Sequence, residues 1–258
     1  RRHGVEVRSP EVCASDWDCT LEGAAVRLGL RMVSGFPEAA AQRVLAARPF
    51  GSVDDLAARA RLNRKELRCL ADGGALAVLA GHRRLAHWAA AGVTRGEGAL
   101  ASVRLPEAPP ALAPPSEGQG IVADYASLGL TLGRHPLALL RPLLARQHFS
   151  TAQALHGLPH GRSTRAAGLV TGRQRPDTTS GVMIVTLEDE TGSANVVVWR
   201  DLAERQRREL LGARLLGVQG VIERNGEVVH LVARRLSDHS PLLAQALGPL
   251  APRSRDFH

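Results

Sequence analysis

Residues 33–44 read Val-Ser-Gly-Phe-Pro-Glu-Ala-Ala-Ala-Gln-Arg-Val, and this stretch decides how the first half of the chain is interpreted. A tight turn at Gly35 and Phe36 leads into an alanine-rich helix, which is the pattern of a helix–hairpin–helix. Glycine in such a turn lets the backbone approach a phosphate closely, and the free N–H groups at the helix start bind that phosphate along the helix dipole. Pro37 stands where a second glycine is usual, so one N–H donor is missing, although proline suits the first position of a helix.

A second copy of the pattern follows. Residues 50–56 form a turn with Ser52 as N-cap, and residues 62–68 begin another helix with Asn63 as N-cap. Arg64 and Lys65 then lie in the first turn, where a positive charge opposes the helix dipole unless an anion lies nearby. Such a tandem module would hold duplex DNA through phosphate contacts, which do not read sequence. The predicted contact residues are Gly35, Phe36, Arg43, Asn63, Arg64, Lys65 and Arg68.

Basic residues concentrate in this same part of the chain. The protein has 258 residues and a formal net charge of +8, and residues 25–95 contain 12 Lys and Arg against 5 Asp and Glu. A basic surplus on one small module favours a polyanionic partner. A helical bundle with solvated arginines on its surface is the alternative that charge alone leaves open.

After residue 163 the pattern changes from helices to strands rich in Val, Ile and Leu. Turns are expected at residues 190–193 and 224–227, and the Asn-Gly pair in the second is a strong hairpin signal. A helix at residues 201–211 interrupts the strands after the third, which is the layout of an OB-fold. The predicted fold is therefore multidomain, α then β, with a tandem helix–hairpin–helix module followed by a five-stranded OB-fold barrel. Its strands are expected at residues 166–173, 182–188, 194–199, 215–222 and 228–233.

OB-folds bind single strands with a basic groove and stacking aromatic side chains. The candidates for single-strand contacts are Arg173, Arg175, Trp199 and Arg200, although Trp199 fits a core position equally well. The acidic residues 188–190 are interpreted as a solvated turn. The residues leave open whether the barrel binds nucleic acid or a protein.

Proline divides the chain. Five prolines within residues 104–120 predict an extended, mobile tether, because proline fixes φ and removes backbone donors. The expected parts are a region before the helical module at 1–24, the helical module at 25–95, the tether and a helical connector at 96–163, the OB-fold at 164–238, and a tail at 239–258.

Several classes of protein and site are excluded by the residues. No apolar run reaches the ~18 residues of a membrane span, and no signal peptide opens the chain. Three cysteines are too few for a disulfide framework or a zinc site, so a reducing cytoplasm is expected. Asp16 and Asp18 lack a third carboxylate to hold Mg²⁺. We expect no catalytic residues, no metal site and no cofactor in this chain.

The combination of these motifs resembles the C-terminal region of bacterial error-prone DNA polymerases of the DnaE type, the ImuC family. The similarity follows the chain in order. The matching segments are residues 15–22 and 27–30, residues 124–125 and 128–136, residues 167–170, 186–192 and 195–199, and the tail at 254–258.

The resemblance implies that residues 1–24 are the end of a polymerase fingers region and that the chain is the DNA-handling end of a longer enzyme. That enzyme would perform translesion synthesis with Mg²⁺ and deoxynucleoside triphosphates, its catalytic palm lying upstream. The implied partners are the proteins of a damage-induced mutagenesis cassette and the sliding clamp. Residues 245–250 are a poor clamp peptide because they lack an aromatic anchor. The rival hypothesis is a freestanding nucleic-acid or protein-binding module with no polymerase activity.

Overall fold

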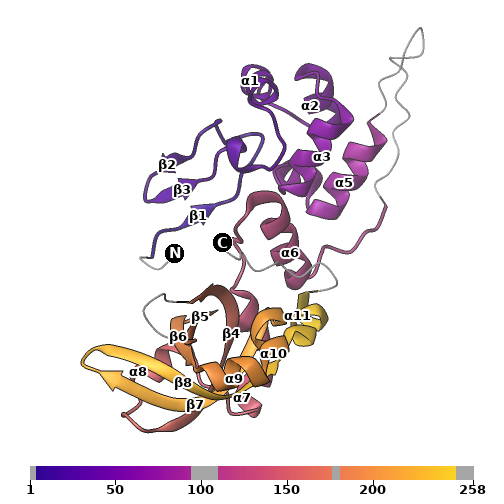
Figure 1. Ribbon diagram of the computed structural model, residues 1–258. Helices are drawn as coiled ribbons and strands as arrows, with labels where there is room; N and C mark the ends of the chain where they lie inside the picture. The colour runs from indigo at the N-terminus through magenta and orange to yellow at the C-terminus, as the bar shows by residue number, and fades with distance from the viewer. Residues whose placement is uncertain (1–3, 94–109, 176–180, 248–258) are drawn as a thin grey trace. The chain divides into compact units, whose positions relative to one another are not determined.

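The computed structural model describes residues 4–93, 110–175 and 181–247. The chain divides into two compact units, Arg1–Gly133 and Arg134–His258 (Figure 1). The first is helical with a small sheet at its start, and the second contains a closed barrel. The predicted order, helices followed by an OB-fold barrel, is confirmed.

Residues 4–27 form a small three-stranded sheet. Strand β3 (Ala25–Arg27) lies between β1 (Val7–Arg8), to which it is parallel, and β2 (Thr20–Glu22), to which it is antiparallel. This segment belongs to the helical unit, because the side chain of Val12 is part of the helical core and its N–H donates to the Ala75 carbonyl at 3.1 Å. The structure therefore places no domain boundary between residues 24 and 25.

The carboxylate of Glu22 stabilises this sheet above about pH 4.5. It accepts hydrogen bonds from Arg27 Nε at 2.7 Å and from Arg8 Nη1 at 2.8 Å, and these bonds lower its pKa to about 2. A depressed folded-state pKa stabilises the protein above the unfolded-state value and loses that effect as pH falls toward the folded-state value. We expect wild type to lose thermal stability relative to Glu22→Gln between about pH 4.5 and pH 2. Circular dichroism at stepped pH measures this, and a stability difference independent of pH would contradict it.

The helical unit contains six helices within the described residues, arranged around one core (Figure 1). Ser52 and Asn63 cap α2 and α3 as predicted, each side chain accepting a hydrogen bond from the backbone N–H three residues on. Leu56, Leu67 and Leu70 are fully buried in the core between them. The helices are α1 (Glu38–Ala46), α2 (Val53–Arg59), α3 (Arg64–Asp72), α4 (Ala77–Ala80), α5 (Arg83–Gly92) and α6 (Glu117–Leu128), preceded by the 3₁₀ turn η1 (Leu30–Met32).

The described part of the proline-rich segment does not behave as a free tether. Residues 104–109 lie outside the described residues, but residues 110–116 run along α5, where His82 and Arg84 bond to the Leu112 and Ala113 carbonyls at 3.0 and 2.9 Å. Helix α6 then begins at Glu117, capped by Ser116. It packs in the helical unit, and Asp124 pairs with Arg83 of α5 at 2.6 Å. The prediction of a tether through residue 120 is therefore wrong from residue 110 onward, because cationic and imidazole side chains hold its carbonyls.

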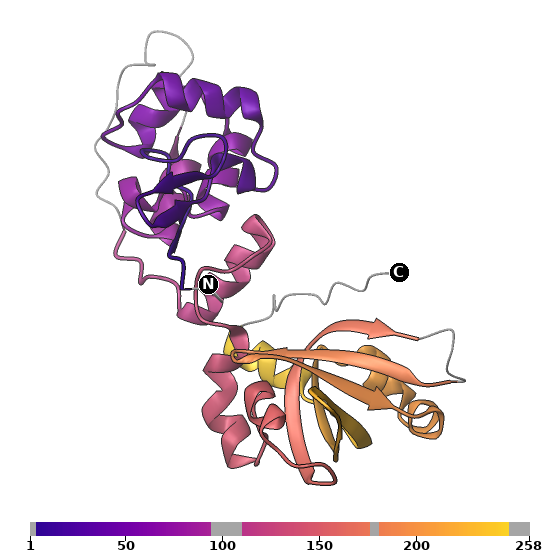
Figure 2. The same ribbon diagram turned by 90° about the vertical axis from the view of Figure 1, so that its left-hand side faces the viewer.

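The second unit is built on a barrel closed in the order β4-β5-β6-β8-β7 (Figure 2). Its last two strands form the hairpin that Asn225-Gly226 predicted, with Gly226 at φ +60°. These strands extend further than expected because they pair along nearly their whole length. The strands are β4 (Ser163–Gln174), β5 (Met183–Asp189), β6 (Gly192–Val198), β7 (Leu215–Asn225) and β8 (Val228–Asp238).

The predicted helix at 201–211 is two helices, α9 (Arg200–Arg205) and α10 (Arg207–Gly212). Gln206 interrupts them with φ −115° and ψ 39°. Its side chain donates to the Leu236 carbonyl at 2.9 Å and accepts from the Leu236 N–H at 2.8 Å. The interruption between α9 and α10 therefore lets the Gln206 amide both donate to and accept from the backbone of β8, as the backbone of a neighbouring strand would.

Helices α7 (Pro136–Arg146), α8 (Ala152–His156) and α11 (Ser240–Leu247) complete the barrel unit. Leu243 and Leu247 of α11 are buried, so the described part of the 245–250 peptide is helical and partly covered. The rest of that peptide lies outside the described residues. Among the described helices, none has the length and apolar character that crossing a membrane requires.

The acidic turn at residues 188–190 is not solvated, so that prediction is wrong. Asp189 is 5% exposed, and its carboxylate accepts hydrogen bonds from the N–H groups of Ala152, Thr191 and Gly192 at 2.7–3.1 Å. Arg141 of α7 pairs with Asp189 at 3.0 Å and also with Glu190. The turn is therefore an ionic joint that attaches α7 and the start of α8 to the β5–β6 hairpin.

Candidate functional site

The predicted hairpin forms between η1 and α1. Gly35 adopts φ +74°, which favours glycine, and the Phe36 N–H donates to the Val33 carbonyl at 3.2 Å. Helix α6 supports the turn from behind, since the Ser34 N–H donates to the Ser127 carbonyl at 2.8 Å. Pro37 is the N-cap and not the first helical residue. The hairpin has the expected shape, with one donor fewer than the usual pattern.

Two of the predicted phosphate contacts at this hairpin have side chains that contact other parts of the helical unit. The Phe36 side chain is 5% exposed and lies in the core. Arg43 pairs with Glu66 at 2.9 Å and donates to the Ala60 carbonyl at 2.9 Å, which ties α1 to the end of α2 and to α3. Glu38 also places a carboxylate in the first turn of α1. The start of α1 is therefore a poor place for a phosphate.

The start of α3 differs from that of α1. Asn63 and Glu66 form a capping box in which each side chain accepts the other residue's N–H, at 2.9 and 2.8 Å. The next two N–H groups belong to Arg64 and Lys65, and neither has an acceptor within the described residues. Both side chains are exposed, as is that of Arg68, which is 3.9 Å from Asp72. Two free N–H groups and two cationic side chains thus gather where the helix dipole is positive.

The four candidates on the barrel separate into two kinds. Arg173 donates to the Leu210 and Ala213 carbonyls at 2.7 and 2.6 Å, so its guanidinium secures the end of α10 to β4. Arg175, Trp199 and Arg200 are exposed, and Trp199 is 56% exposed at the end of β6. Arg200 pairs with Glu204 one helical turn on, at 2.8 Å. The core interpretation of Trp199 is wrong, and its ring is open to a ligand.

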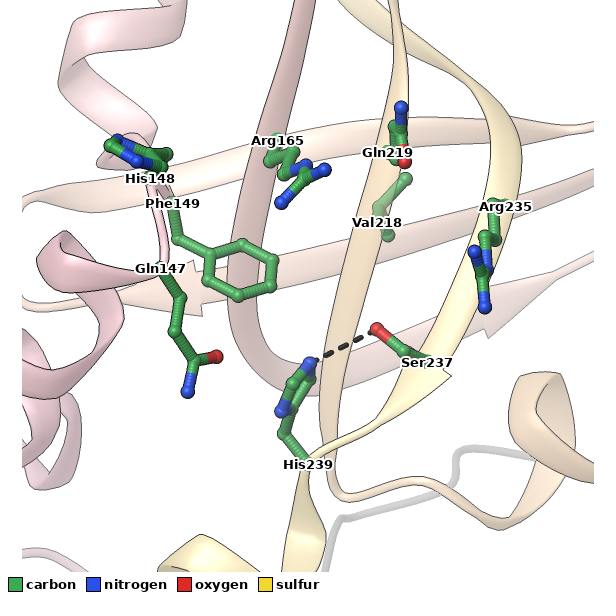
Figure 3. A pocket seen from close by; sticks show the side chains of 9 residues that line it. All are labelled: Gln147, His148, Phe149, Arg165, Val218, Gln219, Arg235, Ser237 and His239. Carbon is green, nitrogen blue, oxygen red and sulfur yellow. Dashed lines mark hydrogen bonds between the residues drawn. The ribbon is translucent and has the colours of Figure 1, made fainter.

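A pocket of about 360 Å³ lies on the outside of the barrel, over β4, β7 and β8 (Figure 3). The sequence analysis missed it, because its lining residues lie up to 92 positions apart in the sequence and no local motif joins them. Only the pairing of the three strands brings them together. The lining residues are Gln147, His148, Phe149, Arg165, Val218, Gln219, Arg235, Ser237 and His239.

Within the described residues, no three His, Cys, Asp or Glu side chains are grouped as metal ligands, and the three cysteines are free thiols. Asp16 and Asp18 instead lie near arginines, Asp16 at 3.8 Å from Arg48 and Asp18 paired with Arg31. The candidate residues at the start of α3, at the barrel surface and in the pocket are therefore mainly cations, amides and aromatic rings. Such side chains are suited to anions and planar groups.

Two family models match the chain. Residues 4–86 match the helix-hairpin-helix motif, and residues 165–238 match the OB-fold nucleic acid binding domain. The first match begins in the small sheet, in agreement with the packing of Val12 into the helical core. Both predicted modules are thus confirmed.

Solved structures share a smaller part of the chain. Asparaginyl-tRNA synthetase from Pyrococcus horikoshii is 19% identical with a TM-score of 0.30, covering 34% of this chain and 22% of its own. The OBody AM1L10, solved bound to hen egg-white lysozyme, is 18% identical with a TM-score of 0.29, covering 36% of this chain and 91% of its own.

Three curated relatives match all of this chain and are named error-prone DNA polymerase. They come from Azoarcus sp. strain BH72, Aromatoleum aromaticum and Alkalilimnicola ehrlichii, at 59%, 57% and 54% identity. The chain spans about a quarter of the length of these relatives, 25–26%. Along its whole length, this chain is homologous to a segment of the bacterial error-prone DNA polymerases.

Proposed function

We propose that this chain is the DNA-holding part of an error-prone polymerase that copies damaged templates. The helical unit would hold duplex DNA by its phosphates, and the barrel would contact single-stranded template or a partner protein. The observation that carries the proposal is the 54–59% identity to these polymerases over the whole chain. Catalysis, with Mg²⁺ and deoxynucleoside triphosphates, would belong to another part of such an enzyme.

The start of α3 is the best-suited phosphate site in the helical unit. Arg64 and Lys65 each offer a backbone N–H and a cationic side chain, and no carboxylate within the described residues pairs with either cation. A phosphate there would also relieve the unfavourable contact between two positive charges and the positive end of the helix. Arg68 extends the same exposed face toward the next turn.

The double variant Arg64→Gln/Lys65→Gln tests this site. We expect it to bind duplex DNA at least about tenfold more weakly at low salt, uniformly across sequences, because phosphate contacts carry no base readout. The salt slope of log K should become shallower by about 1.8, since each phosphate contact contributes about 0.9. Fluorescence anisotropy with labelled duplexes measures both quantities.

Arg31→Gln is the matched control, because Arg31 is an exposed cation of the same unit that pairs with Asp18. It should change duplex affinity less than about twofold. Equal loss in both variants would mean diffuse attraction and not a site. Absence of duplex binding by wild type at low salt would overturn the proposal. Nucleotide incorporation by this chain alone would contradict the part of the proposal that assigns catalysis to another region of the enzyme.

On the barrel, three exposed residues support contact with a single strand. Arg175, Trp199 and Arg200 leave a cation, an aromatic face and a second cation at the surface, the set that sequence-tolerant strand binding uses. Cytoplasmic location and association with a sliding clamp or with mutagenesis-cassette proteins follow from the same proposal. The described part of residues 245–250 gives no support to direct clamp binding, since Leu247 is buried.

A further inference from the structure

The pocket on β4, β7 and β8 is formed by the register of three strands. Arg165 pairs with Gln219, and Gln219 pairs with Arg235, so the three side chains form one row across the sheet. Two strand spacings separate the Cα atoms of the two arginines by about 10 Å. Figure 3 shows the three side chains side by side, each on its own strand.

The pocket exists because the next row of residues across the three strands has small side chains. Gly217 pairs with Ala167 on one side and Ser237 on the other. A Cβ atom at Gly217 would lie 2.6 Å from both His239 Cδ2 and Ser237 Oγ, so only glycine admits the imidazole there. Ser237 Oγ lies 3.0 Å from His239 Nε2, within hydrogen-bond distance. The floor of the pocket is thus backbone and hydroxyl.

An aromatic pair lines one side of the pocket, with Phe149 beside Arg165 and His239 beside Ser237 (Figure 3). The rings of Phe149 and His239 meet edge to face, with centroids 5.2 Å apart and planes at 83°. Helix α7 aims Phe149 inward by ending in a left-handed residue, His148 at φ +60°, which lets the Phe149 N–H donate to the Leu144 carbonyl. This conformation is strained for a residue other than glycine.

The charge of the pocket has one sign. None of its nine lining residues is acidic, and neither Arg165 nor Arg235 has an ion-pair or hydrogen-bond partner for its guanidinium within the described residues. Asp238, the next residue after Ser237, instead accepts a hydrogen bond from the Ser240 N–H at 2.9 Å. Two exposed guanidiniums beside a half-buried ring are open to an anionic ligand with a planar group.

We propose that this pocket binds one nucleotide of a single-stranded nucleic acid, with its base against Phe149 and the flanking phosphates on Arg165 and Arg235. The site is separate from Arg175, Trp199 and Arg200, and it deepens the proposed function by giving the barrel a second strand-binding face. Gln147 and Gln219 supply amides that can pair with base edges. A protein segment fits less well, because the closed barrel has no free strand edge for β-addition and the Val218 side chain is buried in the barrel core, where it offers no apolar contact.

The chain offers a matched pair of arginines for the test. β8 carries one extra residue opposite the step from Gln219 to Gly220, since Gln219 pairs with Arg235 and Gly220 with Ala233. That extra residue is Arg234, which is exposed but does not line the pocket. Arg234→Gln and Arg235→Gln therefore remove the same charge from adjacent positions of one strand.

The probe is a fluorescein-labelled oligothymidylate longer than the ~4–16 nucleotides that one OB-fold occupies. We expect Arg165→Gln/Arg235→Gln to weaken its binding by about tenfold or more and to make the salt slope shallower by about 1.4, from two contacts of about 0.7 each. Arg235→Gln alone should weaken binding severalfold, whereas Arg234→Gln should change it less than about twofold. An oligonucleotide carrying 5-iodouracil should crosslink to Phe149 under ultraviolet light, as mapped by mass spectrometry.

Equal loss in Arg234→Gln and Arg235→Gln, or crosslinks that avoid Phe149, would overturn the proposal. Tighter binding of labelled polyglutamate than of the oligonucleotide, abolished by Arg235→Gln, would also overturn it, in favour of an acidic protein segment. Repeating the measurements in the Arg64→Gln/Lys65→Gln background separates this pocket from the duplex site. If duplex binding by wild type fails while the contrast between Arg234 and Arg235 persists, only the duplex part of the proposed function fails.

Discussion

Replacing Asp189 by alanine is expected to destabilise the barrel unit by about 3–5 kcal/mol, because the substitution leaves the Arg141 guanidinium largely buried without a full set of partners. The Arg141 side chain is 19% exposed and that of Asp189 2%. The variant also removes the acceptor for three backbone N–H groups and for the Thr191 hydroxyl. Hydrogen exchange read by mass spectrometry follows each unit separately, and protection should fall in the barrel unit only.

Asp201→Ala is the control for this prediction. Asp201 is an exposed carboxylate of the same unit, in the first turn of α9, and its loss should cost about 1 kcal/mol or less. Asp189→Asn keeps the size of the side chain and one acceptor oxygen, so the stability of its barrel unit should lie between those of Asp189→Ala and wild type. Barrel protection that is unchanged in Asp189→Ala would show that the ionic joint is not what attaches α7 and α8.

Replacing Gly29 by alanine is expected to destabilise the helical unit by about 3 kcal/mol. A Cβ atom at this position would lie 2.3 Å from the Trp17 carbonyl oxygen and 2.4 Å from the Asp18 carbonyl carbon. Both atoms are backbone, so the loop before β2 must move. That movement breaks the hydrogen bonds by which the Leu30 and Arg31 N–H groups hold the Asp16 and Trp17 carbonyls.

Gly51→Ala is the matched control, because a Cβ atom at Gly51 meets nothing within 4 Å. Hydrogen exchange should show protection lost around residues 4–32 in Gly29→Ala and retained in Gly51→Ala. Similar protection in the two variants would mean that the loop before β2 can move without destabilising the helical unit. Gly29 lies in segment 27–30, which resembles the polymerase family. A loss of protection in Gly29→Ala would give a packing reason for the glycine at this position.

Local signals predicted the elements well. Ser52 and Asn63 identified two helix starts because an N-cap acts within three residues of itself. Asn225-Gly226 identified the last hairpin for the same reason, since a two-residue turn fixes the pairing of its strands. Trp199 could not be placed in this way, because it follows β6 as the N-cap of α9, and only the assembled barrel decides whether the ring at that position is covered.

Arginine roles could not be predicted from the sequence. Arg43, Arg64 and Arg173 are the same residue type in similarly basic stretches. Arg43 and Arg173 are held by carbonyls or a carboxylate of distant elements, whereas Arg64 has no such partner within the part of the chain that the structure describes. Partners 17 to 40 positions away in the sequence leave no local trace. Asp189 could not be predicted for the same reason. An acidic turn is ordinarily exposed to solvent, and only the packing of the distant Arg141 over this turn buries the carboxylate.

The position of α6 has a consequence for how such chains can vary in length. Both flanks of residues 94–109 pack within the helical unit, through Arg84 on one side and the Ala113 carbonyl on the other. Residues added to or lost from that stretch would change a segment whose two ends both belong to the helical unit, and would leave the number of residues that join the two units unchanged. The units join instead at Gly133 and Arg134, just after a segment in which Asp124 accepts hydrogen bonds from Thr131 and Leu132 at 3.2 and 3.4 Å. Changes in the length of the proline-rich stretch therefore leave the connection between the two units untouched, because that connection follows Gly133.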